Sequence, residues 1–125
     1  MTRAKVLLID DDPDFIESTR MVLQSKYDVI TASGGEEGLK KARIERPNVI
    51  LLDIIMPLTD GFTIAESIKK DPQLAKTPIL MLTSFSERVG ESTIPVSRGY
   101  TLEAEDYISK PVKPDELLRR VGKWA

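Results

Sequence analysis

Three runs of consecutive apolar residues, at 6–9, 49–52 and 79–82, constrain the fold of this chain more than any other sequence feature. They lack the alternation of polar and apolar residues that marks a half-exposed strand, so each is expected to be a strand covered on both faces. Such strands belong to parallel sheets flanked by helices. The first two runs lead directly into aspartate, at Asp10 and Asp53. A carboxylate at the end of a buried strand costs free energy unless the protein uses it.

Helical patterns separate these runs, and the alternation predicts a doubly wound α/β fold. The expected strands are Lys5–Ile9, Asp28–Ala32, Val49–Asp53, Ile79–Thr83 and Asp106–Ser109. The expected helices cover 13–25, a stretch from the capping box at 33–36 to about 45, 61–70 and 114–123. The three apolar strands should be central and the two mixed strands should lie at the edges. This is the strand order 2-1-3-4-5 of a flavodoxin-like parallel sheet.

The helix starts carry capping signals. Asp12 precedes Pro13, so an N-cap is followed by a proline at the first helical position. Asp60 is expected to cap the third helix, and Ser33 with Glu36 fits a capping box for the second.

The length of 125 residues fits one domain, 1–125. One segment resists assignment, because 84–105 contains Gly90, Pro95 and Gly99 and shows no clean helical period. It is expected to be an atypical, longer segment in place of a regular fourth helix.

The amino-acid composition limits the kinds of catalytic and metal-binding site that the chain can form. The chain has no cysteine and no histidine, so thiolate chemistry, histidine bases and histidine metal ligands are excluded. An acidic, all-oxygen site favours hard cations such as Mg²⁺, Mn²⁺ or Ca²⁺. The net charge of −2 offers no basic field for nucleic acid or an anionic membrane. No apolar stretch approaches membrane-spanning length and no signal peptide precedes the first strand, so we expect a cytoplasmic protein.

The predicted strand order has its switch point between the first and third strands, where ligands bind in open α/β sheets. It therefore brings Asp10 and Asp11 close to Asp53, in an acidic pocket that suits a divalent cation. An ionised aspartate is also a competent nucleophile toward a phosphoryl group. Thr83 and Lys110 end the other two strands of this edge and supply a hydroxyl and a cation. The proline after Lys110 allows a cis peptide bond there.

These pieces together resemble the receiver domain of response regulators in two-component signalling. The matching segments, in family order, are 9–13 (IDDDP), 53–57 (DIIMP) followed by Asp60 and Gly61, 82–84 (LTS) and 106–111 (DYISKP). The resemblance covers nearly the whole chain. It implies that Asp53 is the phosphoacceptor. It also implies a Mg²⁺ (or Mn²⁺) site formed by Asp10, Asp11, Asp53 and the backbone carbonyl of Ile55.

The resemblance assigns further roles. Thr83 and Lys110 bind the phosphoryl oxygens, and Tyr107 is the switch aromatic that moves inward when Thr83 shifts. The implied donor is a sensor histidine kinase or a histidine phosphotransfer protein. The chain is then a signalling switch that catalyses its own phosphorylation and dephosphorylation, with output through protein contacts and no direct binding to nucleic acid or membrane.

Two departures from the family pattern stand out. The stretch between Thr83 and Lys110 is longer than usual, and it shows Glu103-Ala104-Glu105 where Gly-Ala is common. Ile55 and Phe85, two residues past Asp53 and Thr83, are both apolar. Those positions tune the access of hydrolytic water in the family, so we expect a long-lived phosphoryl state.

Other function classes fit parts of the pattern. A receiver-like docking module that is never phosphorylated would share the fold. Asp10 and Asp12 also resemble the Asp-x-Asp of haloacid-dehalogenase-type phosphatases, with Asp10 as nucleophile, but those enzymes usually need a longer chain and a cap. A calcium-binding loop fails because Phe15 stands where that motif needs glycine. Three carboxylates after the first strand would repel the phosphate of a flavin carrier.

Overall fold

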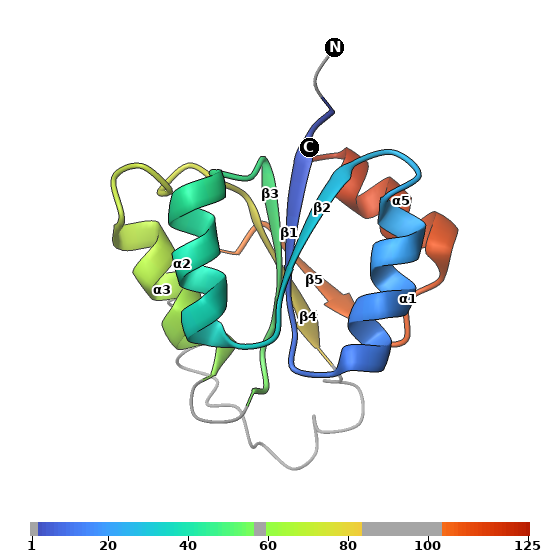
Figure 1. The fold of residues 1–125 in the computed structure, drawn as a ribbon, viewed down its shortest axis with the longest axis horizontal. Coiled ribbons are helices and arrows are strands. Elements are labelled where there is room, and N and C mark those ends of the chain that lie inside the picture. The colour runs from blue at the N-terminus through green and yellow to red at the C-terminus, as the bar shows by residue number, and fades with distance from the viewer. Residues whose placement is uncertain (1–2, 57–59, 84–103) are drawn as a thin grey trace.

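A computed structural model describes residues 3–56, 60–83 and 104–125, drawn as coloured ribbon in Figure 1. Its strands are β1 (Lys5–Ile9), β2 (Asp28–Ala32), β3 (Val49–Asp53), β4 (Ile79–Thr83) and β5 (Asp106–Ser109). Its helices are α1 (Pro13–Leu23), α2 (Gly35–Glu45), α3 (Gly61–Lys70) and α5 (Pro114–Gly122). None of these helices is long and apolar enough to cross a membrane.

The strands form one parallel sheet in the order β2-β1-β3-β4-β5, which confirms the predicted fold. Helices α2 and α3 cover one face of the sheet, and α1 and α5 cover the other (Figure 1). The two mixed strands lie at the edges, as expected from their composition. The carboxyl ends of β1, β3, β4 and β5 lie at the same edge of the sheet. Asp10, Asp11 and Asp53 are located at this edge.

Two core clusters fill the layers on either side of the sheet. Alternate residues of the central strands face α2 and α3 or face α1 and α5, so every residue from Val6 to Ile9 is fully buried. The same holds for the apolar residues of β3 and β4. Burial on both faces explains why these strands read as continuous apolar runs. Helix α3 presents Phe62, Ala65 and Ile68 to the core, where all three are buried.

The helix ends follow the predicted signals with small corrections. The carboxylates of Asp12 and Asp60 cap α1 and α3 as predicted. The capping box at 33–36 is wrong by one residue, because Gly34 is the N-cap and Glu37 accepts the bond from the Ser33 amide. Helix α1 ends at residue 23 rather than 25, and α5 ends at 122 rather than 123. Leu23 is the last buried residue of α1, and the chain must then turn toward β2.

The atypical segment between β4 and β5 lies mostly outside the described residues, which resume at Ala104. Glu105 is described, and it ties three elements together. Its carboxylate accepts a hydrogen bond from the Ile79 amide at 2.7 Å, and it contacts the Lys69 ammonium at 3.2 Å. Its own amide donates to the Ile79 carbonyl at 2.9 Å. Glu105 therefore anchors the entry into β5 to β4 and α3.

We expect Glu105→Ala to lower the free energy of unfolding by about 1–2 kcal/mol, because it removes the partner of a partly buried amide. Chemical denaturation measures this directly. Glu17→Ala is the matched control, since Glu17 pairs only with Arg20 on an exposed face of α1 among the contacts described. That pair is expected to contribute less than about 0.5 kcal/mol. Equal losses in the two variants would contradict the role given to Glu105.

Candidate functional site

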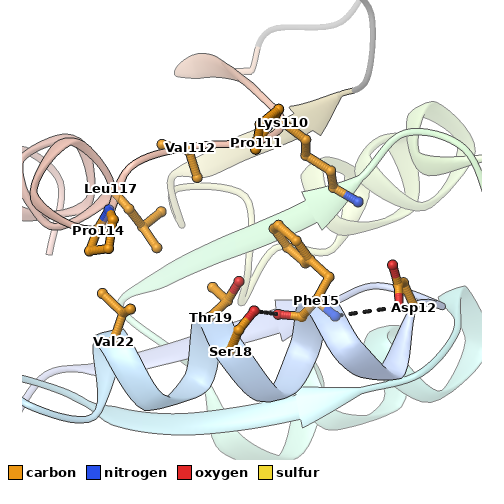
Figure 2. Close-up of a pocket in the computed structure, with 10 residues that line it drawn as sticks. All are labelled: Asp12, Phe15, Ser18, Thr19, Val22, Lys110, Pro111, Val112, Pro114 and Leu117. Atoms are coloured by element: carbon orange, nitrogen blue, oxygen red, sulfur yellow. Dashed lines mark hydrogen bonds between the residues drawn. The ribbon is translucent and has the colours of Figure 1, made fainter.

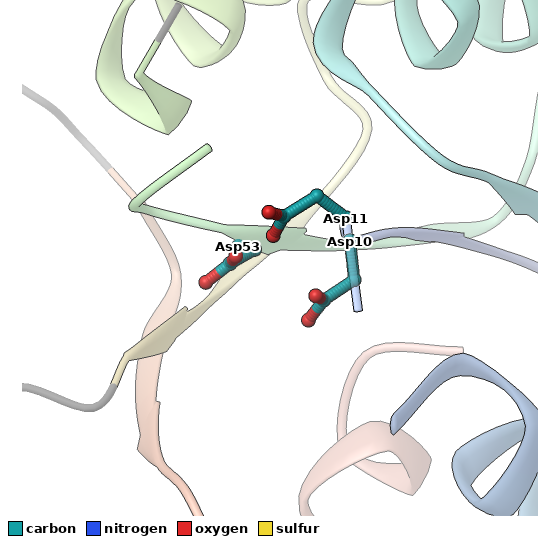
Figure 3. A group of neighbouring side chains, drawn as sticks. All are labelled: Asp10, Asp11 and Asp53. Carbon is teal, nitrogen blue, oxygen red and sulfur yellow. The ribbon is translucent and has the colours of Figure 1, made fainter. Parts of the chain in front are cut away.

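Three carboxylates converge at the carboxyl edge of the central strands (Figure 3). Asp10 directly follows β1 and Asp53 is the last residue of β3, and the register of these strands pairs Ile9 with Leu52. Asp11 is exposed, whereas Asp10 and Asp53 are buried. One oxygen from each of the three carboxylates lies within 4.8 Å of the others. The structure thus brings together the acidic residues that the strand order predicted to meet.

The surroundings of Asp53 strongly raise the pKa of its carboxyl group. Its side chain is 8 % exposed. Burial, and after it the neighbouring charge of Asp10, together raise the pKa of this carboxyl from 3.8 to about 7, although the Lys110 ammonium opposes the rise. Burial without enough positive charge makes this carboxylate costly to ionise. A divalent cation would remove that penalty, and three carboxylates are the hard oxygen donors that Mg²⁺ takes. The residues present fit such an ion.

Lys110 is held beside two of the carboxylates. Its backbone amide donates to the Thr83 carbonyl at 2.7 Å, which continues the pairing of β5 with β4. The peptide bond to Pro111 is cis, as the sequence allowed. The Nζ atom donates to the Asp10 carboxylate at 2.7 Å and lies 3.5 Å from Asp53 Oδ1. The ammonium therefore sits closer to Asp10 than to the predicted phosphoacceptor.

The Thr83 hydroxyl is a buried polar group that lacks a hydrogen-bond partner within the described residues. Thr83 ends β4, next to the Asp53 strand, and only 5 % of the residue is exposed. Buried hydroxyl groups nearly always have a hydrogen-bond partner, so a buried hydroxyl without one is unusual. A hydroxyl without a partner at this edge of the sheet fits a site whose acceptor arrives with a ligand.

Two further predicted residues lie at the margin of the pocket. Ile55 is 36 % exposed and forms an isolated antiparallel bridge with Asp60, which brings the chain after β3 back to the start of α3. Tyr107 is 41 % exposed and lies on the edge strand β5. The roles assigned to both stay predictions. Phe85, the other residue on which the phosphoryl lifetime prediction rests, lies outside the described residues.

Phe15 also contacts the site, and the sequence did not predict this contact. The Lys110 ammonium lies over its ring, 4.2 Å from the centroid. The available signal was its position in the first turn of a helix that starts beside Asp10 and Asp11. Conversely, the third aspartate of the run is structural, because Asp12 caps α1 through the amides of Asp14 and Phe15.

The arrangement matches a known family. A family model of the response regulator receiver domain matches residues 6–122. The chain belongs to this family. Among solved structures, the chemotaxis protein CheY4 of Vibrio cholerae is 33 % identical with a TM-score of 0.86, covering 99 % of this chain and 100 % of that one. This receiver therefore has the CheY-like fold as well as the family's sequence.

Two other relatives bear on the site and on the full-length context. The receiver domain of a Pseudomonas aeruginosa sensor histidine kinase, with magnesium in its active-site cleft, is 25 % identical with a TM-score of 0.85, covering 98 % of each chain. The Bacillus subtilis regulator of alkaline phosphatase synthesis, PhoP, is 40 % identical over 94 % of this chain and 46 % of its own length. The chain spans about half the length of the curated relatives it matches.

Proposed function

We propose that Asp53 of this receiver accepts a phosphoryl group from a phosphohistidine on a sensor kinase or histidine phosphotransfer protein. The observation that carries the proposal is that buried Asp53 lies 3.5 Å from the Lys110 ammonium, at the same edge of the sheet as the Thr83 hydroxyl, which has no partner within the described residues. Phosphoryl transfer needs mainly positioning and charge neutralisation, and these groups supply both.

In the proposed reaction, an Asp53 oxygen attacks the phosphorus and the phosphorus–nitrogen bond of the donor histidine breaks. The bonding electrons leave with the imidazole, and an aspartyl phosphate remains. Lys110 moves the short distance from Asp10 toward the new phosphoryl oxygens, and the Thr83 hydroxyl donates to one of them. Asp10, Asp11, Asp53 and the Ile55 carbonyl would hold Mg²⁺, which when bound neutralises the negative charge shared by the carboxylates and the phosphoryl group.

The contacts of Asp10 argue against the phosphatase alternative. Asp10 is fully buried, one of its oxygens accepts from the Asp12 amide at 2.9 Å, and the other accepts from Lys110. A carboxylate with both oxygens engaged is poorly placed to attack phosphorus. The docking-module alternative shares the fold, and it predicts that no phosphoryl group is taken up.

The test is intact-mass measurement after incubation with acetyl phosphate and Mg²⁺. We expect the wild-type protein to gain the mass of one phosphoryl group, because a small donor bypasses the unknown kinase. Asp53→Asn should gain nothing. Asp60→Asn is the matched control, since it retains a cap residue for α3 and leaves the three pocket carboxylates in place. An excess of EDTA should slow uptake by at least about ten-fold, as expected if neutralisation lowers the barrier by about 1.4 kcal/mol or more.

No gain of mass, or an equal gain in Asp53→Asn, would overturn the proposal. A phosphoryl group found on Asp10 in that variant would favour the phosphatase reading. The loss of the phosphoryl group after removal of the donor also measures its lifetime, which the apolar Ile55 leads us to expect to be long.

We further propose that residues 1–125 act as one receiver domain that works as a cytoplasmic switch rather than as an enzyme with a diffusible substrate. It would signal through contacts with other proteins. These contacts would change when Thr83 shifts and the Tyr107 side chain moves inward. The exposure of Tyr107 on β5 supports this, because a half-exposed ring at an edge strand has room to change position. No direct contact of this chain with nucleic acid is proposed.

A further inference from the structure

Among the residues that the structure describes, Phe15 contacts the Lys110 side chain but has no part in the proposed chemistry. The Lys110 ammonium lies over the face of its ring, 4.2 Å from the centroid. Figure 2 shows the lysine side chain extending from the end of β5 toward this ring, which projects from the first turn of α1. A cation within about 6 Å of a ring centroid is attracted to the negative face of the ring. Lys110 therefore has an aromatic neighbour besides Asp10 and Asp53.

We propose that Phe15 is a positioning residue whose ring face holds the Lys110 ammonium within reach of both Asp10 and Asp53, and so speeds phosphoryl transfer to Asp53. This inference rests on the proposed function of Asp53. It assigns to Phe15 a role that goes beyond filling the layer between α1 and the sheet.

The distances explain why a ring suits this task. The ammonium is 2.7 Å from Asp10 and 3.5 Å from Asp53, so it must shift only slightly to meet a phosphoryl group on Asp53. A ring face attracts the charge without accepting a directed hydrogen bond as a carboxylate would. It can therefore support the ammonium over a range of positions. It also limits the rotamers of a long side chain that would otherwise lose entropy on binding the phosphoryl group.

The ring is placed independently of the lysine. The Phe15 amide donates to the Asp12 side chain at 3.4 Å in the cap of α1. The ring is half-buried and packs against the core cluster between the sheet, α1 and α5. It lines a groove between α1 and the start of α5, together with Thr19, Val112 and Leu117 (Figure 2). Because helix capping and core packing fix the ring, its attraction for Lys110 is preorganised.

A double-mutant cycle separates positioning from packing, because leucine retains most of the apolar volume but has no ring face. The rate of phosphoryl uptake from acetyl phosphate is measured for wild type, Phe15→Leu, Lys110→Ala and the double variant. We expect Phe15→Leu to slow wild type about three- to ten-fold, the range of a partly exposed cation–π contact. It should change the Lys110→Ala rate by less than about two-fold, since the ring then has no ammonium to hold.

Two further variants control for packing. Phe15→Tyr keeps the ring face and should retain the wild-type rate. Val22→Ala removes apolar volume at the other end of the same groove (Figure 2) and should leave the rate unchanged while lowering stability. Denaturant midpoints of the four proteins in the cycle are measured in parallel, and they should show that the Phe15 and Lys110 substitutions are not additive.

Equal slowing by Phe15→Leu in both backgrounds would overturn the inference, and so would an unchanged rate in the wild-type background. A Phe15→Tyr rate as low as that of Phe15→Leu would do the same. If wild type takes up no phosphoryl group, the proposed function fails separately, and additive midpoints would then exclude the Phe15–Lys110 contact on their own.

Discussion

Gly61→Ala is expected to lower the free energy of unfolding by about 3 kcal/mol or more, the upper end of the range for overpacking. A Cβ atom on Gly61 would lie 2.3 Å from the Asp53 carbonyl oxygen and 2.9 Å from the Ile54 Cα. Both atoms belong to the backbone, so no side-chain rotation relieves the clash. The Gly61 amide also donates to the Ile54 carbonyl at 2.7 Å, which clamps the start of α3 to the end of β3. The chain around Asp53 must shift, and phosphoryl uptake should fall with it.

Gly34→Ala is the control for this prediction. Gly34 is the N-cap of α2, its backbone is extended, and a Cβ atom there would meet nothing within 4 Å. The expected loss is below about 1 kcal/mol, the scale of a changed N-cap. Denaturant unfolding compares the two variants, and comparable losses would contradict the close-approach role of Gly61.

Asp53→Asn is expected to stabilise the metal-free protein by on the order of 4 kcal/mol at pH 8, since the pKa rise from 3.8 to about 7 spans about three units and each unit corresponds to about 1.4 kcal/mol. Burial and the charge of Asp10 raise the pKa of Asp53 to about 7 in the folded protein. A raised folded-state pKa means that stability is fully present below 3.8 and is lost as the pH rises through about 7. The neutral amide avoids this loss. The advantage of the variant should therefore shrink as the pH falls from 8 to 4.

Asp106→Asn is the matched control because its expected effect has the opposite sign. Hydrogen bonds from Arg120 hold the pKa of Asp106 below its usual range, so its ionised form stabilises the fold. Its replacement should lower stability at pH 8. Unfolding in EDTA across this pH range measures both variants. If Asp53→Asn were less stable than wild type at pH 8, the ionised Asp53 carboxylate would not be destabilising the folded protein. Added Mg²⁺ should raise the stability of wild type more than that of this variant, because the variant lacks one of the carboxylates.

Much of the fold could be predicted from the sequence because its determinants are local. Continuous apolar runs identify strands buried on both faces, and their alternation with amphipathic helices leaves few topologies. Asp12 and Asp60 cap helices through amides two or three residues away, so those starts were also predictable. The capping box of α2 was placed one residue early, because Ser33 and Glu37 can be matched to a helix start only once Gly34 is known to be its N-cap.

The sequence by itself determined that Asp10, Asp11 and Asp53 meet, since the continuous apolar runs indicate which strands are central and where each one ends. It also determined that Thr83 and Lys110 lie at the same edge. Only the tertiary structure decided which of the carboxylates at that edge pairs with Lys110. The Lys110 side chain is long enough to reach either Asp10 or Asp53. Only the structure shows that its ammonium lies closer to Asp10, at 2.7 Å, than to Asp53, at 3.5 Å.

The tertiary structure also decided the contacts of Phe15 and Glu105 and the lack of space at Gly61. Each of these joins residues far apart in the chain or brings backbone segments into close approach. Close packing between the layers sets such distances. Hydrophobic periodicity has no comparable resolution, because it specifies which face of an element is buried but not which atoms meet there.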